Sequence, residues 1–257
     1  MKLDQFENAV EAFEFSIAID EEYSSAYINI SEALIKLEKF DQAKKYLERS
    51  LSLDGPSPEI YSCLGNVNFY LEDYSTSISF YQKSIKIDQM FKESYFGLGR
   101  SLSKLDKWFE AIHFFKKAYK IDNKNIEYVK SLAYAEFKVG NLVSSIDLYS
   151  KAVEMQPDDY KLSLDFSLIY YESGDIDKAI DIIDQAIEES PGESLLYYRL
   201  VIYLMDAGRY KESINVLESA LSLNFDNHDV LFDFVPNFES QSALIRVINQ
   251  FKNSGNR

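Results

Sequence analysis

Residues 71–88 read LEDYSTSISFYQKSIKID, and versions of this stretch recur along the whole chain. Residues 37–54 read LEKFDQAKKYLERSLSLD, and residues 105–122 read LDKWFEAIHFFKKAYKID. In the same frame the stretch also begins at residues 3, 139, 173 and 207, so every step is 34 residues long. A fixed period of this length is the signature of a repeat architecture, in which one structural unit stacks on the next.

Each repeat contains two segments with the helical period. Apolar residues recur at three- and four-residue spacing over residues 95–105 and again over residues 108–121, which predicts a pair of amphipathic helices. Ser57 followed by Pro58 predicts the start of a helix, because serine caps the first turn and proline fits within it. Glycines that can close the first helix of a pair stand at Gly140, Gly174 and Gly208.

Several columns of the repeat contain only small residues, which lets the backbones of facing helices approach closely. One such column is Ala9, Ala43, Ser77, Ala111, Ser145, Ala179 and Ser213, and another is Ser16, Ser50, Ser84, Ala118, Ala152, Ala186 and Ala220. A third column has Ser31, Gly65, Gly99, Ala133 and Ser167, with Val201 as its exception. Large residues fill neighbouring columns, so the sequence predicts helices that interlock in a regular way.

With these columns in place the chain resembles tetratricopeptide-repeat proteins. The signature residues of one repeat are Tyr61, Leu64, Gly65, Tyr74, Ser77, Tyr81 and Ser84, and those of the next are Tyr95, Leu98, Gly99, Trp108, Ala111, Phe115 and Ala118. The resemblance covers about residues 3–227. It implies an all-α fold, a right-handed superhelical solenoid of antiparallel helix pairs with a capping helix at the C-terminal end.

The period also predicts how the chain is divided. We expect residues 1–23 to form the second helix of a truncated first repeat, whose missing partner would leave part of its face uncovered. Residues 24–227 should form six full repeats, and residues 228–257 the capping helices and tail, with an amphipathic closing helix over 240–252. Asn68 and Glu136 stand in a column otherwise held by large residues, so we expect them to be partly solvated or hydrogen bonded.

Composition limits the classes of function. The chain has 27 basic and 42 acidic residues, a net charge of −15, which argues against nucleic-acid and anionic-membrane partners. The N-terminus lacks the apolar stretch of a secretory signal, and a single cysteine fits a reducing compartment. We therefore expect a cytoplasmic protein. Few arginines among many Ile, Lys, Tyr and Phe residues suggest AT-rich coding and a bacterial source.

The sequence offers no constellation of catalytic residues. His113 shares its column with solvent-facing polar residues, and His228 lies at a junction between repeats. Cys63 is a single thiol with no neighbouring base in the sequence. Metal-ligand spacings, phosphate-binding glycine loops and nucleophile elbows are absent from the sequence. We expect no enzymatic activity, no cofactor and no bound metal.

The resemblance implies that the first helices of the repeats line a concave groove in which a protein or peptide binds. A four-residue step along each first helix then predicts which side chains point inward. The expected groove residues are Asn66, Phe69, Tyr70, Phe96, Arg100, Lys104, Lys130, Tyr134, Phe137, Lys138, Lys161, Leu164, Leu168, Tyr171 and Tyr198. The same ridge passes through Glu32 and Lys36, with Ile35 at its flank.

Two parts of this groove differ in character. Basic groups stand among aromatic rings from Phe69 to Lys138, which would suit an acidic peptide anchored by its side chains. Farther along, an apolar stripe from Leu164 to Met205 would take a helix or an apolar segment, or would be closed by the C-terminal helix. The predicted function is a non-catalytic adaptor. The alternatives are a scaffold within a longer protein and self-association through the uncovered N-terminal helix.

Overall fold

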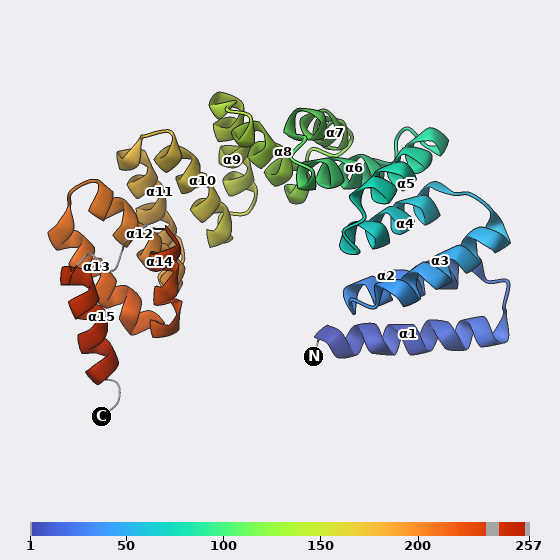
Figure 1. Cartoon of the computed structure of the whole chain (residues 1–257), viewed down its shortest axis with the longest axis horizontal. Coiled ribbons are helices and arrows are strands. Elements are labelled where there is room, and N and C mark those ends of the chain that lie inside the picture. Colours follow the sequence, from blue (N-terminus) through green and yellow to red (C-terminus); the bar gives the residue numbers. More distant parts are fainter. Residues whose placement is uncertain (1, 235–241, 255–257) are drawn as a thin grey trace. The chain divides into compact units, whose positions relative to one another are not determined.

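A computed structural model describes residues 2–234 and 242–254, and over these ranges the chain contains helices and turns with no strand (Figure 1). The first helices of six pairs are α2 (Ser24–Lys36), α4 (Pro58–Tyr70), α6 (Lys92–Lys104), α8 (Ile126–Lys138), α10 (Tyr160–Glu172) and α12 (Ser194–Asp206). Their second helices are α3 (Phe40–Asp54), α5 (Tyr74–Ile87), α7 (Trp108–Ile121), α9 (Leu142–Met155), α11 (Ile176–Glu189) and α13 (Tyr210–Leu223). Successive first helices begin 34 residues apart, as do successive second helices, so the predicted period is confirmed.

Three elements lie outside these pairs, together with a 3-10 turn. Helix α1 (Lys2–Ile19) precedes α2, and a 3-10 turn (Phe225–Asp229), α14 (Val230–Phe234) and α15 (Ser242–Ser254) follow α13. The expected start of the closing helix at residue 240 lies outside the described residues. The division into a truncated repeat, six full repeats and a cap stays a prediction.

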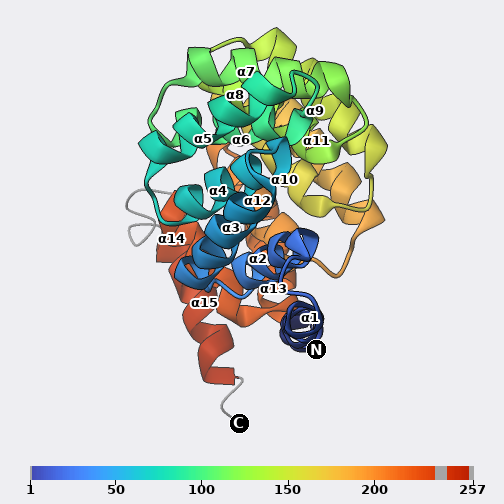
Figure 2. The ribbon, with the colours of Figure 1, turned by 90° about the vertical axis from the view of Figure 1, so that its right-hand side faces the viewer.

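The chain forms two compact units, residues 1–140 with α1–α8 and residues 141–257 with α9–α15. In unit 1 consecutive helices pack against each other from α1 to α8, and each first helix also contacts the next first helix. Figure 2 shows α1 end-on beside α2. In unit 2, α15 packs against α13 and α14 against α12 (Figure 1).

The small columns lie in the helix interfaces, as predicted. From the second repeat onward every member is buried. An ideal Cβ on Gly65 would lie 2.6 Å from the Tyr81 ring, and one on Gly99 would lie 2.7 Å from the Phe115 ring. Only glycine therefore fits where these rings meet the backbone. On α1, whose outer face has no helix partner among the described residues, Ala9 is half-buried and Phe15 is 69% exposed.

Polar members of the core are hydrogen bonded or ion paired. The Ser77 hydroxyl lies 2.8 Å from the Gly65 carbonyl oxygen and 2.9 Å from the Ser101 hydroxyl. Asn68 is 3% exposed, and its side-chain nitrogen donates to the Leu64 carbonyl oxygen at 2.7 Å. Glu136 is 1% exposed, with the Lys116 ammonium 2.6 Å from its carboxylate. Asn68 is therefore hydrogen bonded, which was one of the two expected outcomes, and Glu136 is held by an ion pair.

The turn inside each pair uses one left-handed residue at the same column. Glycines occupy it at residues 140, 174 and 208, with φ between 74° and 88°. The earlier pairs place Glu38, Glu72 and Asp106 there at φ of 56° to 61°, so the turn geometry persists without glycine. The predicted helix start is also observed, because α4 begins at Pro58 and the Ser57 hydroxyl accepts from the Ile60 amide at 3.1 Å.

Candidate functional site

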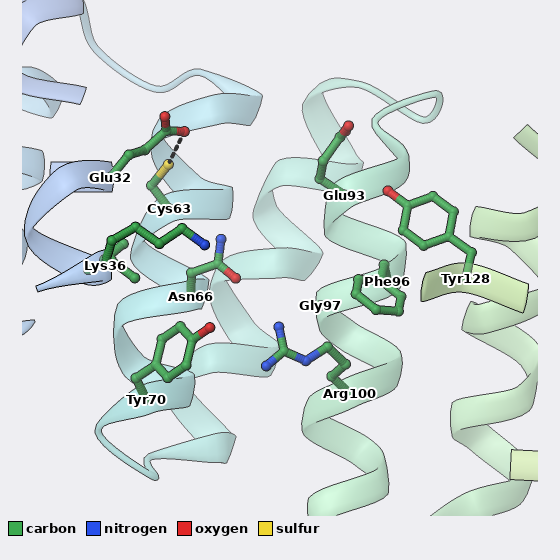
Figure 3. A pocket seen from close by; sticks show the side chains of 11 residues that line it. Glu32, Lys36, Cys63, Asn66, Tyr70, Glu93, Phe96, Gly97, Arg100 and Tyr128 are labelled. Atoms are coloured by element: carbon green, nitrogen blue, oxygen red, sulfur yellow. Dashed lines mark hydrogen bonds between the residues drawn. The ribbon is translucent and has the colours of Figure 1, made fainter. Parts of the chain in front are cut away.

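The first helices of unit 1 enclose a hollow of about 370 Å³, which we call the central pocket (Figure 3). It lies between α2, α4 and α6, with one residue from α8 at its edge. Its lining residues are Glu32, Ile35, Lys36, Cys63, Asn66, Tyr70, Glu93, Phe96, Gly97, Arg100 and Tyr128. Four of the predicted groove residues, Asn66, Tyr70, Phe96 and Arg100, therefore meet at one place.

Arg100 is held in position by aromatic rings. Its guanidinium carbon lies 4.1 Å from the centre of the Phe69 ring and 5.8 Å from the centres of both the Tyr70 and Phe96 rings. Such contacts attract the cation to the ring faces and limit the rotamers of the side chain. The positive charge at the pocket is thus preorganised.

Asn66 is oriented by a residue of the second helix. Tyr81, which is 1% exposed, donates its hydroxyl proton to Asn66 Oδ1 at 2.7 Å. Because the Asn66 carboxamide oxygen accepts this bond, it points toward Tyr81. The carboxamide nitrogen, which is a donor, then points toward Lys36 and the pocket (Figure 3). Burial raises the pKa of the Tyr81 phenol, so this hydroxyl stays a proton donor over the physiological pH range.

Carboxylates share the pocket with these donors. Glu32 and Glu93 lie at one end of it, and Tyr70 and Arg100 lie toward the other end (Figure 3). The Cys63 sulfur lies 3.9 Å from Glu32 Oε1. Burial, aided by the negative charge of Glu32, raises the pKa of the Cys63 thiol to about 12. Cys63 is therefore a neutral thiol, and nothing in its surroundings activates it as a nucleophile.

The remaining predicted residues of unit 1 differ in their exposure and in their contacts. Phe69 is 8% exposed and lies beneath Arg100, so it is a platform for the cation rather than a free anchor. Near the end of α8, the Tyr134 ring packs edge-on against Trp108 at 5.6 Å and lies 6.4 Å from the Phe137 ring. Lys138 reaches over the Trp108 ring at 5.7 Å. Lys104 is exposed, and Lys130 pairs with Glu127 at 3.4 Å.

In unit 2 the predicted apolar stripe is only partly accessible. Lys161 is exposed, and Leu164, Leu168 and Tyr171 are half-buried on α10. Tyr198 is fully buried and donates its hydroxyl proton to the Asn224 carbonyl oxygen at 2.9 Å, so its assignment to the groove was wrong.

Ile202 and Met205, at the far end of the stripe, are also buried. They belong to one apolar cluster with Leu231 of α14 and with Leu244 and Ile248 of α15. The C-terminal helices therefore contribute to closing this part of the stripe.

The sequence analysis did not assign four of the lining residues to the groove: Cys63, Glu93, Gly97 and Tyr128. Cys63 and Gly97 share a column that runs beside the predicted ridge, and the lack of a side chain at Gly97 was a signal of close approach. Among the residues that the structure describes, no group of three or more His, Cys, Asp or Glu side chains could hold a metal ion. His113 is exposed, as predicted.

Comparison with protein families now defines what kind of chain this is. A tetratricopeptide-repeat model matches residues 1–66 and 136–201, and a second model of the same repeat matches residues 92–125 and 195–227. The chain belongs to the tetratricopeptide-repeat family. No curated protein matches it.

Solved tetratricopeptide-repeat structures share the fold. MamA is 23% identical with a TM-score of 0.59, over 70% of this chain and 98% of that one. YrrB, described as a TPR protein with an unusual peptide-binding site, is 18% identical with a TM-score of 0.54, over 87% and 97%. The C-terminal part of a TPR repeat-containing protein from Cytophaga hutchinsonii is 17% identical with a TM-score of 0.67, over 91% and 96%. At these identities the likeness establishes the fold alone.

None of the described helices is both long enough and apolar enough to cross a membrane.

Proposed function

We propose that this chain is a non-catalytic adaptor and that unit 1 binds a segment of a protein partner along its first helices, with the central pocket as the main contact. Membership of the tetratricopeptide-repeat family supports a role in protein interaction, and the peptide-binding site of YrrB shows that a protein of the same fold binds peptides. The observation that carries the proposal is the central pocket itself, with its preorganised Arg100.

The pocket has the properties of an interaction hot spot. Tyr70 is 42% exposed and Phe96 is half-buried, so both rings can bury further area against a partner. Arg100 is fixed over Phe69 before binding, so ordering this side chain costs little entropy when a partner arrives. Asn66 adds a donor whose orientation is set by Tyr81. These features suit recognition of a polar group within an otherwise apolar contact.

A capture experiment with matched charge changes tests the proposal. The full chain is compared with Arg100→Glu in the pocket and with Lys120→Glu, an exposed residue in the last turn of α7. Both variants change the net charge by the same amount. We expect the wild type and Lys120→Glu to retain the same partner from a lysate of the source cells, and Arg100→Glu to retain at least about tenfold less, as is usual for a hot-spot arginine.

Circular dichroism should show equal helix content in all three proteins. If all three proteins retain the same partners in the same amounts, the central pocket is ordinary surface and the proposed binding site is wrong. Binding through the uncovered face of α1, including self-association, stays a separate prediction.

A further inference from the structure

The two borders of the groove in unit 1 carry opposite charges. The first turns of α4, α6 and α8 place Glu59, Glu93 and Glu127 along one border, which we call the acidic edge. The last turns of α2, α6 and α8 place Lys36, Lys104 and Lys138 along the other, which we call the basic edge. All six side chains are exposed. Glu93 and Lys36 both line the central pocket, so both edges border the same hollow.

Charge preferences of helix ends do not account for this arrangement. Acidic residues in the first turn and basic residues in the last turn do favour the helix macrodipole. In unit 2, however, α10 begins with Lys161 in its first turn and ends on Glu172, and α12 ends on Asp206. On α10 the same two columns therefore carry the reverse charges, and on α12 the first of them holds the neutral Leu195. The edges of unit 1 are a property of that unit and not of the repeat.

The middle of the groove continues the pattern. Within the central pocket, Glu32 lies at the same end as Glu93, while Arg100 lies toward the opposite end (Figure 3). The lining thus includes two carboxylates, Glu32 and Glu93, and two cations, Lys36 and Arg100. A purely acidic partner would be attracted by the two cations and repelled by the two carboxylates. Charge complementarity therefore favours a partner that carries both positive and negative charges.

The dimensions point to a helix as the occupant. Glu93 and Lys104 are eleven residues apart on α6, which is about 16 Å at 1.5 Å per residue, whereas a helix with its side chains is about 10–12 Å wide. Successive first helices in contact lie about 8–10 Å apart, so the charges of one edge repeat at about that distance. Seven residues of a helix rise about 10.5 Å, so equivalent positions of successive heptads would meet successive first helices.

We propose that unit 1 binds an amphipathic helix with basic residues on one flank and acidic residues on the other, its apolar face resting on Tyr70 and Phe96. The basic flank faces Glu59, Glu93 and Glu127, and the acidic flank faces Lys36, Lys104 and Lys138. This inference rests on the proposed function, because it names the chemistry of the partner that the same groove takes.

The probes are three fluorescein-labelled peptides of three heptads each, with the same apolar face. The first has Lys on one flank and Glu on the other, the second has Glu on both flanks, and the third has Lys on both. Fluorescence anisotropy with the full chain measures each affinity. We expect the first peptide to bind at least tenfold more tightly than the second and the third.

Reversing the acidic edge tests the assignment of the flanks. In the triple variant Glu59→Lys, Glu93→Lys and Glu127→Lys both edges are basic, so the peptide with Glu on both flanks should become the tightest ligand. A control variant places three lysines at Asp41, Glu48 and Glu110, which are exposed on the second helices α3 and α7, and should keep the wild-type preference. Circular dichroism confirms that both variants are folded.

The possible outcomes separate the two proposals. If the wild type binds the peptide with Glu on both flanks as tightly as the two-sided peptide, or if the edge variant keeps the wild-type preference, the two-sided partner is wrong although the groove still binds. If none of the three peptides binds to the wild type, the groove fails as a site for helices, and the two-sided partner fails with it. The capture experiment with Arg100→Glu then decides the proposed function independently.

Discussion

Gly97 should tolerate no side chain, although it lies in a helix and lines a surface pocket. An ideal Cβ at this position would stand 2.2 Å from Cζ and 2.4 Å from Cε1 of Tyr81. The Tyr81 ring cannot move aside toward α4, because it already packs closely against Gly65. An ideal Cβ on Gly65 would lie only 2.6 Å from the same Cε1 atom. Tyr81 is 1% exposed and is held between two glycines, one on each of the neighbouring first helices.

The size of the effect follows from two opposing terms. Alanine is better than glycine in a helix by about 1 kcal/mol, which favours Gly97→Ala. Overpacking a filled core costs typically about 1–3 kcal/mol, and contacts this short place Gly97→Ala at the upper end of that range. We therefore expect a net loss of about 2 kcal/mol in the free energy of unfolding.

Urea denaturation followed by circular dichroism measures this loss. Gly192→Ala is the matched control, because a Cβ there meets nothing within 4 Å, and its effect should stay within about 0.5 kcal/mol. A second test combines Gly97→Ala with Tyr81→Ala, where the added methyl group enters the space that the ring has left. The two changes should then cost less together than the sum of their separate costs. A Gly97→Ala protein as stable as the wild type would refute the close packing described for Tyr81.

Two further predictions concern local features of unit 1. Ser57→Ala removes the hydroxyl that accepts from the Ile60 amide at the start of α4, and should lower the free energy of unfolding, measured by urea denaturation, by about 1 kcal/mol. The control Ser52→Ala, on the exposed side of α3, should lower it by less than half as much. Equal losses would contradict the capping role of Ser57. Cys63 is 6% exposed and its pKa is raised to about 12, above that of an unfolded thiol, so the thiolate is scarce in the folded protein at pH 8. Iodoacetamide should alkylate it at least about 100-fold more slowly in buffer than in urea, and similar rates would contradict its buried position.

The period and the small columns predicted nearly all of the fold. The 34-residue frame located the helix pairs because each column has one structural task, such as the buried position of Ser77 against the Gly65 carbonyl. The frame also assigned Asn66 and Arg100 to one groove, because both lie in the column that faces inward in every repeat.

What the frame could not predict is the contact between columns. Phe69 stands among exposed groove residues in the sequence, yet it is covered by Arg100 of the next first helix. Tyr198 occupies a groove column, yet it is buried, and its hydroxyl bonds to the chain that leaves the last full pair. Both depend on neighbours that the period does not specify, a long flexible side chain in one case and an irregular terminal segment in the other.

Different columns of the repeat have different tasks, and this explains how a regular solenoid can become specific for one partner. Columns that face neighbouring helices must keep small residues such as Ser77 or Ala111 in every repeat, because backbone approach depends on them. Columns at the groove edges contribute little to packing, so their charges can change without loss of the fold. In unit 1 these columns hold glutamate on one edge and lysine on the other, while α10 in unit 2 has Lys161 and Glu172 in the reverse order. A partner that binds through the charges of these edges would distinguish the two units, even though their helices repeat at the same period.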